Sequence, residues 1–191
     1  MPVEYVNRKS QTYYLHQSTT KTGKPKYFFS MKSQGTLVET IPDGFEIYEN
    51  PNAQVFLRRV QPQIITNDEI TTVEEGIKKF SRLEYYQLDV KKNIIIVYLP
   101  NQNVNVFSEI LKTSSRTQLT DIQSILNCSL SYSPMLQFVL VDENKRLFIT
   151  QRYCFLGSID DWMYIGNPNT LQNLVERYVQ HLGSDSYYEL Y

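Results

Sequence analysis

Over its first sixty residues the chain alternates between short aromatic or β-branched runs and polar clusters rich in Gly, Pro, Asn and Lys. Short runs of this composition are typical of β-strands, and the clusters between them are typical of turns. The five predicted strands are residues 3–7, 12–17, 26–31, 45–49 and 55–60. Together they fill the region, so the sequence predicts a small antiparallel meander there.

After residue 60 the spacing of apolar residues changes to that of a helix. Apolar side chains share one helical face at Ile70, Val73, Ile77 and Phe80. Thr66 and Glu69 have the spacing of a capping box, in which each side chain bonds the other residue's backbone amide. We therefore predict a helix over 67–80.

The remaining residues are predicted to form two hairpins and three more helices. The hairpins pair 84–90 with 94–99 and 135–141 with 146–155, and the helices cover 103–112, 119–128 and 168–182. Asn167 would cap the last helix and Pro168 would occupy its first turn, while 156–162 is predicted to be a loop. The result is an α+β fold with a small β-meander subdomain (1–60) and an α+β domain (61–191) of antiparallel hairpins covered by helices.

Composition excludes several classes of protein. Hydrophobic residues are 41% of the chain and charged residues 20%, which supplies a core and argues against disorder. There are two cysteines and two histidines, with no Cys-x-x-Cys pair, so we expect no metal site and no cofactor. The longest aliphatic run, 94–99, is far below the ~20 residues that cross a bilayer, and no signal peptide follows Met1, so we expect a soluble cytoplasmic protein without a membrane partner.

Charge is unevenly distributed, and the basic end carries the first candidate site. Residues 1–36 hold six basic residues and one acidic residue, although the whole chain has a net charge of −1. The candidate binding residues are Lys21, Lys24, Lys26, Tyr27, Phe28, Arg58 and Arg59. Such lysines can contact phosphates while an exposed ring stacks on a base. The alternative is an ordinary turn, with lysines in solvent and aromatic rings in the core.

A phosphate-binding loop of the nucleotide-hydrolase type is excluded at this turn. That loop needs a second glycine and consecutive backbone amides around the phosphate, whereas here Gly23 and Lys24 are followed by Pro25, which has no amide hydrogen.

A second candidate is acidic, in the segment Gly157–Trp162. Asp160 and Asp161 could bind a metal or act as acid and base, as in a hydrolase, provided that the segment is a loop. On a strand, adjacent side chains point to opposite faces and could not share a ligand. The alternative is a loop whose aspartates bond backbone amides, with Cys154 buried beside it and Trp162 anchoring it.

Several segments together resemble a family of uncharacterised bacterial proteins: "YVNRK", "TKTGKPKYFFS", "IPDGFEIYEN" and "CFLGSIDDW", with the terminal helix. The resemblance implies no activity, and no functional residue can be carried over from it. With no pairing of nucleophile and base in the sequence, we favour a binding module that uses the basic, aromatic hairpins over an enzyme. A protein and a nucleic acid are both open as its partner.

Overall fold

A computed structural model describes residues 1–191 except 105, 107–108, 110–124, 127 and 157–158. Contacts between residues divide the chain into two units: the first is Met1–Val60 with Gln102–Ser131, and the second is Gln61–Asn101 with Tyr132–Tyr191. This division differs from the predicted one in the assignment of 102–131. The helices predicted over 103–112 and 119–128 fall largely outside the described residues.

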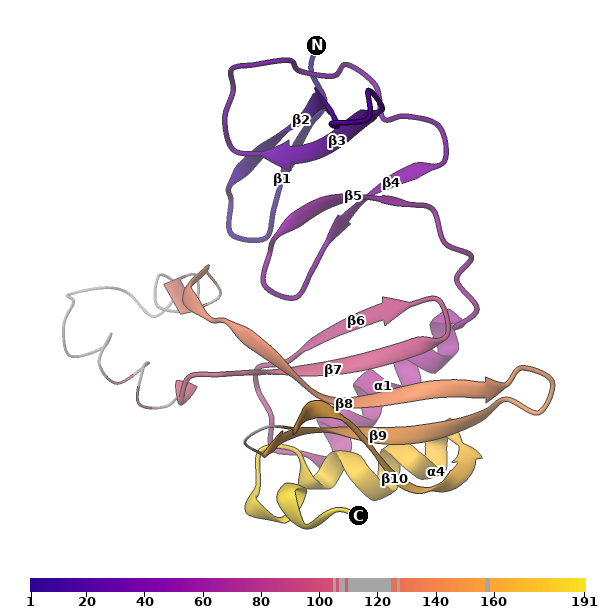
Figure 1. The fold of residues 1–191 in the computed structure, drawn as a ribbon. Coiled ribbons are helices and arrows are strands. Elements are labelled where there is room, and N and C mark those ends of the chain that lie inside the picture. Colours follow the sequence, from indigo (N-terminus) through magenta and orange to yellow (C-terminus); the bar gives the residue numbers. More distant parts are fainter. Residues whose placement is uncertain (105, 107–108, 110–124, 127, 157–158) are drawn as a thin grey trace. The chain divides into compact units, whose positions relative to one another are not determined.

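The described residues of the first unit contain five short antiparallel strands, as the alternation of runs and turns predicts (Figure 1). A three-stranded sheet has the order β1 (Glu4–Val6), β2 (Thr12–Thr19), β3 (Pro25–Ser30), and a separate hairpin joins β4 (Phe45–Glu49) to β5 (Val55–Arg59). Pro25 begins β3, at the edge of its sheet, where its missing amide hydrogen leaves no ladder bond unmade.

Two hairpin turns in this unit share one design. In 7–11 and in 50–54 an asparagine begins the turn, a glutamine ends it, and the fourth residue is left-handed: Ser10 has φ 57° and Ala53 has φ 63°. The oxygen of each asparagine side chain accepts hydrogen bonds from the amides two and four residues later. Its amide group donates to the glutamine side chain, at 3.0 Å in the first turn and 2.8 Å in the second. The spacing Asn-x-x-x-Gln is therefore a sequence signal for this turn.

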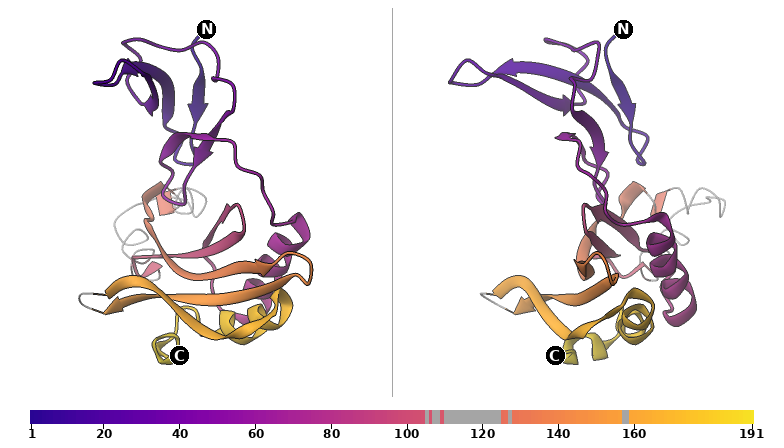
Figure 2. Two further views of the ribbon diagram at one scale, coloured as in Figure 1. Left: turned by 45° about the vertical axis from the view of Figure 1, so that its right-hand side comes forward. Right: turned by 90° about the vertical axis from the view of Figure 1, so that its right-hand side faces the viewer.

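The second unit is a five-stranded antiparallel sheet with helices on one face (Figure 2). The strand order is β10 (Ile159–Thr170), β9 (Leu147–Leu156), β8 (Tyr132–Asp142), β7 (Ile94–Pro100), β6 (Gln87–Lys91). The core lies between this sheet and the helices α1 (Asn67–Phe80) and α4 (Leu171–Tyr178). In the coarse sense the chain is thus α+β: antiparallel sheets with two helices among the described residues.

Helix α1 has the predicted bounds and the predicted capping box between Thr66 and Glu69. Glu69 also accepts two hydrogen bonds from the guanidinium of Arg146, in the turn between β8 and β9, at 2.9 and 2.5 Å. Gly76, unfavourable in a helix by propensity alone, is required by packing, because a Cβ there would lie 2.0 Å from a methyl group of Val175 on α4. Glu69 and Gly76 thus fix the start and the packing of this helix.

The predicted start of the last helix is wrong, and so is the loop predicted over 156–162 where it covers 159–162. Strand β10 begins at Ile159 and continues to Thr170, so Asn167 and Pro168 belong to the strand. The pairing of β10 with β9 is interrupted between Ile165 and Asn169, which accommodates Pro168 and its missing amide hydrogen. A helix was predicted over 168–182 and α4 covers Leu171–Tyr178 of that range, but the proline signal was assigned to the wrong element.

The C-terminal residues pack onto the sheet through Tyr187, which is 1% exposed. Its hydroxyl donates to the carbonyl of Met135 and accepts from the amide of Tyr153. Burial raises the pKa of Tyr187 well above its ordinary value, so the hydroxyl remains a donor. These contacts fix the C-terminal segment against β8 and β9.

Candidate binding surfaces

The strands β2 and β3 divide the candidate binding residues between two faces. Side chains alternate along a strand, so Lys26 and Phe28 lie on one face of β3 and Tyr27 lies on the other. Tyr27 packs toward the β4–β5 hairpin, with its ring 6.5 Å from that of Phe45. The structure therefore does not bring Tyr27 and Phe28 together, and it makes the face with Lys26 and Phe28 the outer one.

Phe28 is the aromatic residue that this outer face presents to solvent, at 39% exposed. Its ring stacks on His16 of β2, with centroids 5.4 Å apart and planes inclined by 14°. His16 is buried, and its Nε2 lies 2.9 Å from the carbonyl oxygen of Lys32, in the segment that crosses this face. A fixed imidazole thus supports an exposed ring.

Basic side chains lie on the side of the Phe28 ring toward the β2–β3 turn. Lys26 follows Phe28 on the same face, and Lys21 and Lys24 lie in the turn that joins β2 to β3; all three are exposed. The turn is closed by the bond from the amide of Lys24 to the hydroxyl of Thr20, and by Gly23 with φ 78°. No acidic residue occurs between Tyr5 and Val38.

The two predicted arginines of β5 are engaged within the first unit. Arg58 donates to Glu46 at 2.7 Å, and its guanidinium lies 4.1 Å from the centre of the Tyr48 ring. Arg59 lies over Phe45 at 5.6 Å. These contacts account for both cations, so we leave them out of the binding surface.

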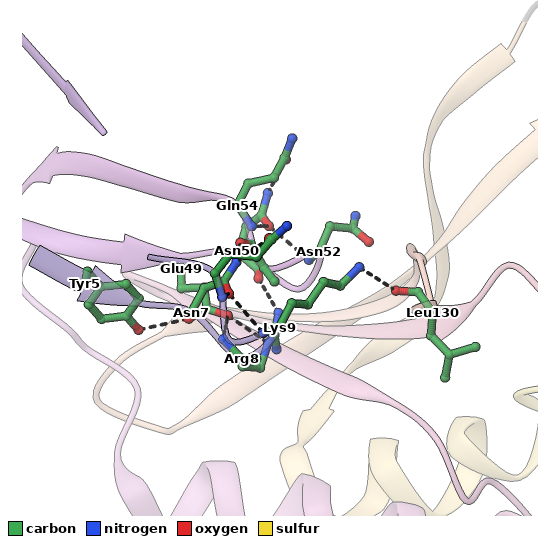
Figure 3. A network of polar contacts seen from close by, with 11 residues as sticks. Tyr5, Asn7, Arg8, Lys9, Glu49, Asn50, Asn52, Gln54 and Leu130 are labelled. Carbon is green, nitrogen blue, oxygen red and sulfur yellow. Dashed lines mark hydrogen bonds and ion pairs between the residues drawn. The ribbon is translucent and has the colours of Figure 1, made fainter. Parts of the chain in front are cut away.

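A polar cluster joins the β1–β2 hairpin of the first unit to its β4–β5 hairpin (Figure 3). Glu49 of β4 accepts from the hydroxyl of Tyr5 at 2.9 Å and pairs with Arg8 at 2.9 Å. Asn7, which is buried, donates to the carbonyl of Ala53 at 2.7 Å. We call these residues, with Asn50 whose carbonyl accepts from Arg8, the turn clamp. The clamp therefore joins the two hairpins through hydrogen bonds and an ion pair.

The acidic candidate is distributed along a strand. Asp160 pairs with Phe155 and Asp161 with Cys154 across β9 and β10, so the two carboxylates leave on opposite faces. Asp161 accepts from the amide of Trp162 at 2.7 Å. Residues 157–158 of the segment lie outside the described residues. Tyr153 lies beside Asp160: its hydroxyl donates to the carbonyl of Asp160 at 3.2 Å, and desolvation together with the charges of Asp160 and Asp161 raises the pKa of Tyr153.

Sequence reasoning missed an aromatic surface on the second unit. Tyr153 and Phe155 of β9 and Trp162 of β10 lie on the sheet face opposite the core, because Cys154 and Arg152 between them point inward. Tyr153 is 4.9 Å from Phe155 and 5.0 Å from Trp162, between ring centres. The aromatic residues at alternate positions, Tyr153 and Phe155 and then Trp162 and Tyr164, are the sequence signal that could have revealed it.

The described part of the chain offers no group of metal ligands and no membrane-spanning helix. Its His, Cys, Asp and Glu residues form no group of three that could hold a metal ion. Its helices are each too short or too polar to cross a bilayer.

Comparison with known proteins adds no relative to this α+β chain. No protein-family model, curated protein or solved structure matches it. The resemblance to uncharacterised bacterial proteins stays a hypothesis.

Proposed function

We propose that the first unit is a binding module for single-stranded nucleic acid, and that the outer face of β2 and β3 is its contact surface. The observation that carries the proposal is the Phe28 ring, exposed, stacked on His16 and flanked by Lys26. A ring held flat at the surface offers one base a stacking partner without losing rotamer freedom on binding.

The positive charge of this surface favours a polyanion as its ligand over an acidic or neutral protein, whose surface has no defined shape to match it. Lys21, Lys24 and Lys26 follow the hairpin from its tip toward Phe28, and each could lie beside one phosphate of an extended strand. An unpaired strand can present a base to Phe28 while its backbone follows the lysines, whereas duplex bases are already stacked on one another.

The test is fluorescence anisotropy of labelled single-stranded and double-stranded DNA and RNA at two salt concentrations. We expect the single strands to bind more tightly than the duplexes. Three phosphate contacts predict a slope of about −2 to −3 in log affinity against log salt. Phe28→Ala should weaken binding by about 5-fold to 150-fold, the equivalent of about 1–3 kcal/mol per stacked base.

Two variants make the result specific. Phe28→Leu keeps an apolar side chain but removes the aromatic face, so it should lose nearly as much affinity as Phe28→Ala. Phe56→Ala, at a similarly exposed ring on the other hairpin of the unit, should bind like the unchanged protein. Equal binding by all three variants, or a null result for every nucleic acid, would refute the proposal and leave a protein partner for the same surface.

A further inference from the structure

A hollow of about 410 Å³ lies in the second unit, beside the aromatic surface. It is bounded by the ends of β7, β8 and β9 and by the C-terminal segment 183–188. Two exposed rings line it, Phe155 at 48% and Tyr188 at 57% exposed. Its polar groups include the hydroxyls of Ser133 and Ser184 and the carboxylate of Asp185.

The rings continue out of this hollow along the sheet. Phe155, which lines it, is in contact with Tyr153, and Tyr153 with Trp162. We call Tyr188, Phe155, Tyr153 and Trp162 the aromatic track. The track runs from a hollow with polar groups, past Phe155 at the end of β9, to the sheet face opposite the core, which suits a ligand that is long and repeats one chemical unit.

Internal bonds hold the wall of the hollow in place. Tyr188 packs edge-on against the buried ring of Tyr187, with centres 5.3 Å apart. The hydroxyl of Ser186 lies 2.8 Å from Nδ1 of His181 and 2.8 Å from the hydroxyl of Ser184. A hollow whose wall is fixed in this way requires little ordering when a ligand binds.

The charges in and around the hollow limit the chemical classes of ligand that it could bind. No Lys, Arg or His lines the hollow among the described residues, and the second unit has 13 acidic and 9 basic residues. Phosphate and other anions are therefore disfavoured. Aromatic faces beside hydroxyl and carboxylate acceptors match a ligand with C–H faces on one side and many hydroxyl groups at its edge. We infer that this track binds a neutral, linear polysaccharide, with one sugar in the hollow and others on the rings.

The chain carries its own probe for this binding. Trp162 is the sole tryptophan, so intrinsic fluorescence reports the far end of the track. The experiment titrates the full chain with cellohexaose, chitohexaose and xylohexaose and measures sedimentation with insoluble cellulose and chitin. We expect at least one of these ligands to shift the Trp162 emission in a saturable way and to retain the protein in the pellet.

Variants place the ligand on the track. Phe155→Ala and Tyr188→Ala should each weaken saccharide binding at least about fivefold, as for central contacts of an interface. Asp185→Asn, which keeps an acceptor oxygen, should weaken it less. Phe28→Ala should not change it, just as Phe155→Ala should not change nucleic-acid binding, so failure here is separable from failure of the proposed function.

Three outcomes would overturn the inference. The first is the absence of binding to every saccharide. The second is binding that survives both Phe155→Ala and Tyr188→Ala. The third is binding of tetramethylammonium or phosphocholine, abolished by Asp185→Asn, in place of saccharide, because rings beside a carboxylate would then be a cation site.

Discussion

The two units of this protein are stabilised by different kinds of contact. The second unit has a continuous apolar core of buried side chains from four strands, two helices and the C-terminal residues. In the first unit, among described residues, the buried apolar set is short: Leu15, Ala53, Val55, Leu126 and Leu130. Its hairpins are joined instead by the turn clamp.

The two kinds of contact differ in how strictly they require a particular geometry as well as in how much they stabilise. Apolar packing stabilises in proportion to the area buried and tolerates small shifts, whereas a hydrogen bond fails when its partners move by an ångström. The clamp can therefore fix the register of short strands that bury little area. We expect the second unit to be sensitive to changes of volume and the first to single polar groups.

The largest effect should follow removal of a core ring in the second unit. Phe138 is 0% exposed, so Phe138→Ala should destabilise the second unit by about 3–5 kcal/mol through lost burial and a cavity. Urea unfolding followed by Trp162 fluorescence measures it, because Trp162 lies in that unit. The control is Phe56→Ala, which removes an exposed ring of the first unit and should leave the midpoint of the Trp162-monitored unfolding unchanged. A loss below 1 kcal/mol would mean that the core is loosely packed.

The next effect should come from the turn clamp. Arg8→Ala removes the pair with Glu49, whose side chain is 10% exposed, and should destabilise the first unit by about 1–3 kcal/mol. Hydrogen exchange should show faster exchange in β4 and β5 and an unchanged Trp162 transition. Arg8→Lys keeps the charge but loses the forked donor geometry, so an intermediate result is expected. Unchanged exchange in β4 and β5 would show that the clamp does not stabilise the hairpins.

A smaller change of opposite sign is expected at Thr150 in the second unit. Its side-chain hydroxyl is buried and has no hydrogen-bond partner among the described residues. Thr150→Val keeps the shape and removes the unpaired group, so it should stabilise the unit by about 1 kcal/mol. Thr150→Ala should destabilise it, since it leaves a small cavity. A loss of stability in the valine variant would reveal a partner for the hydroxyl.

Local signals predicted most of the elements from the sequence. The spacing of Ile70, Val73 and Ile77 and the capping box gave α1 its bounds, because each of these features acts within a few residues. The start of strand β10 was mistaken for a loop because Asp160 and Asp161 are turn residues by propensity, while long-range pairing with β9 overrides propensity.

The candidate sites were harder to predict for the same reason. The lysines of the β2–β3 turn and the ring of Phe28 are neighbours in sequence, so their association could be proposed, but which ring faces outward depends on the packing of Tyr27 against Phe45. The aromatic track joins Tyr188 to Phe155 through folding alone. A single sequence carries no signal for that juxtaposition.

The smallest effect should be the pH dependence contributed by Glu69. Partial burial alone would raise the pKa of Glu69, but hydrogen bonds from Arg146 and Thr66 outweigh it and lower the pKa below 4.5. The lowered pKa in the folded state means that this carboxylate stabilises the second unit above the ordinary Glu value, and that the gain is lost as pH falls through the folded pKa. Glu69→Gln should cost about 0.5–1 kcal/mol at neutral pH and reduce the loss of unfolding free energy as pH falls below the ordinary Glu pKa, measured by Trp162-monitored unfolding. Glu75→Gln, exposed on the same helix, is the matched control, and its profile should follow that of the unchanged protein. Parallel profiles for both variants would show that the contacts from Arg146 and Thr66 do not distinguish the two charge states of Glu69.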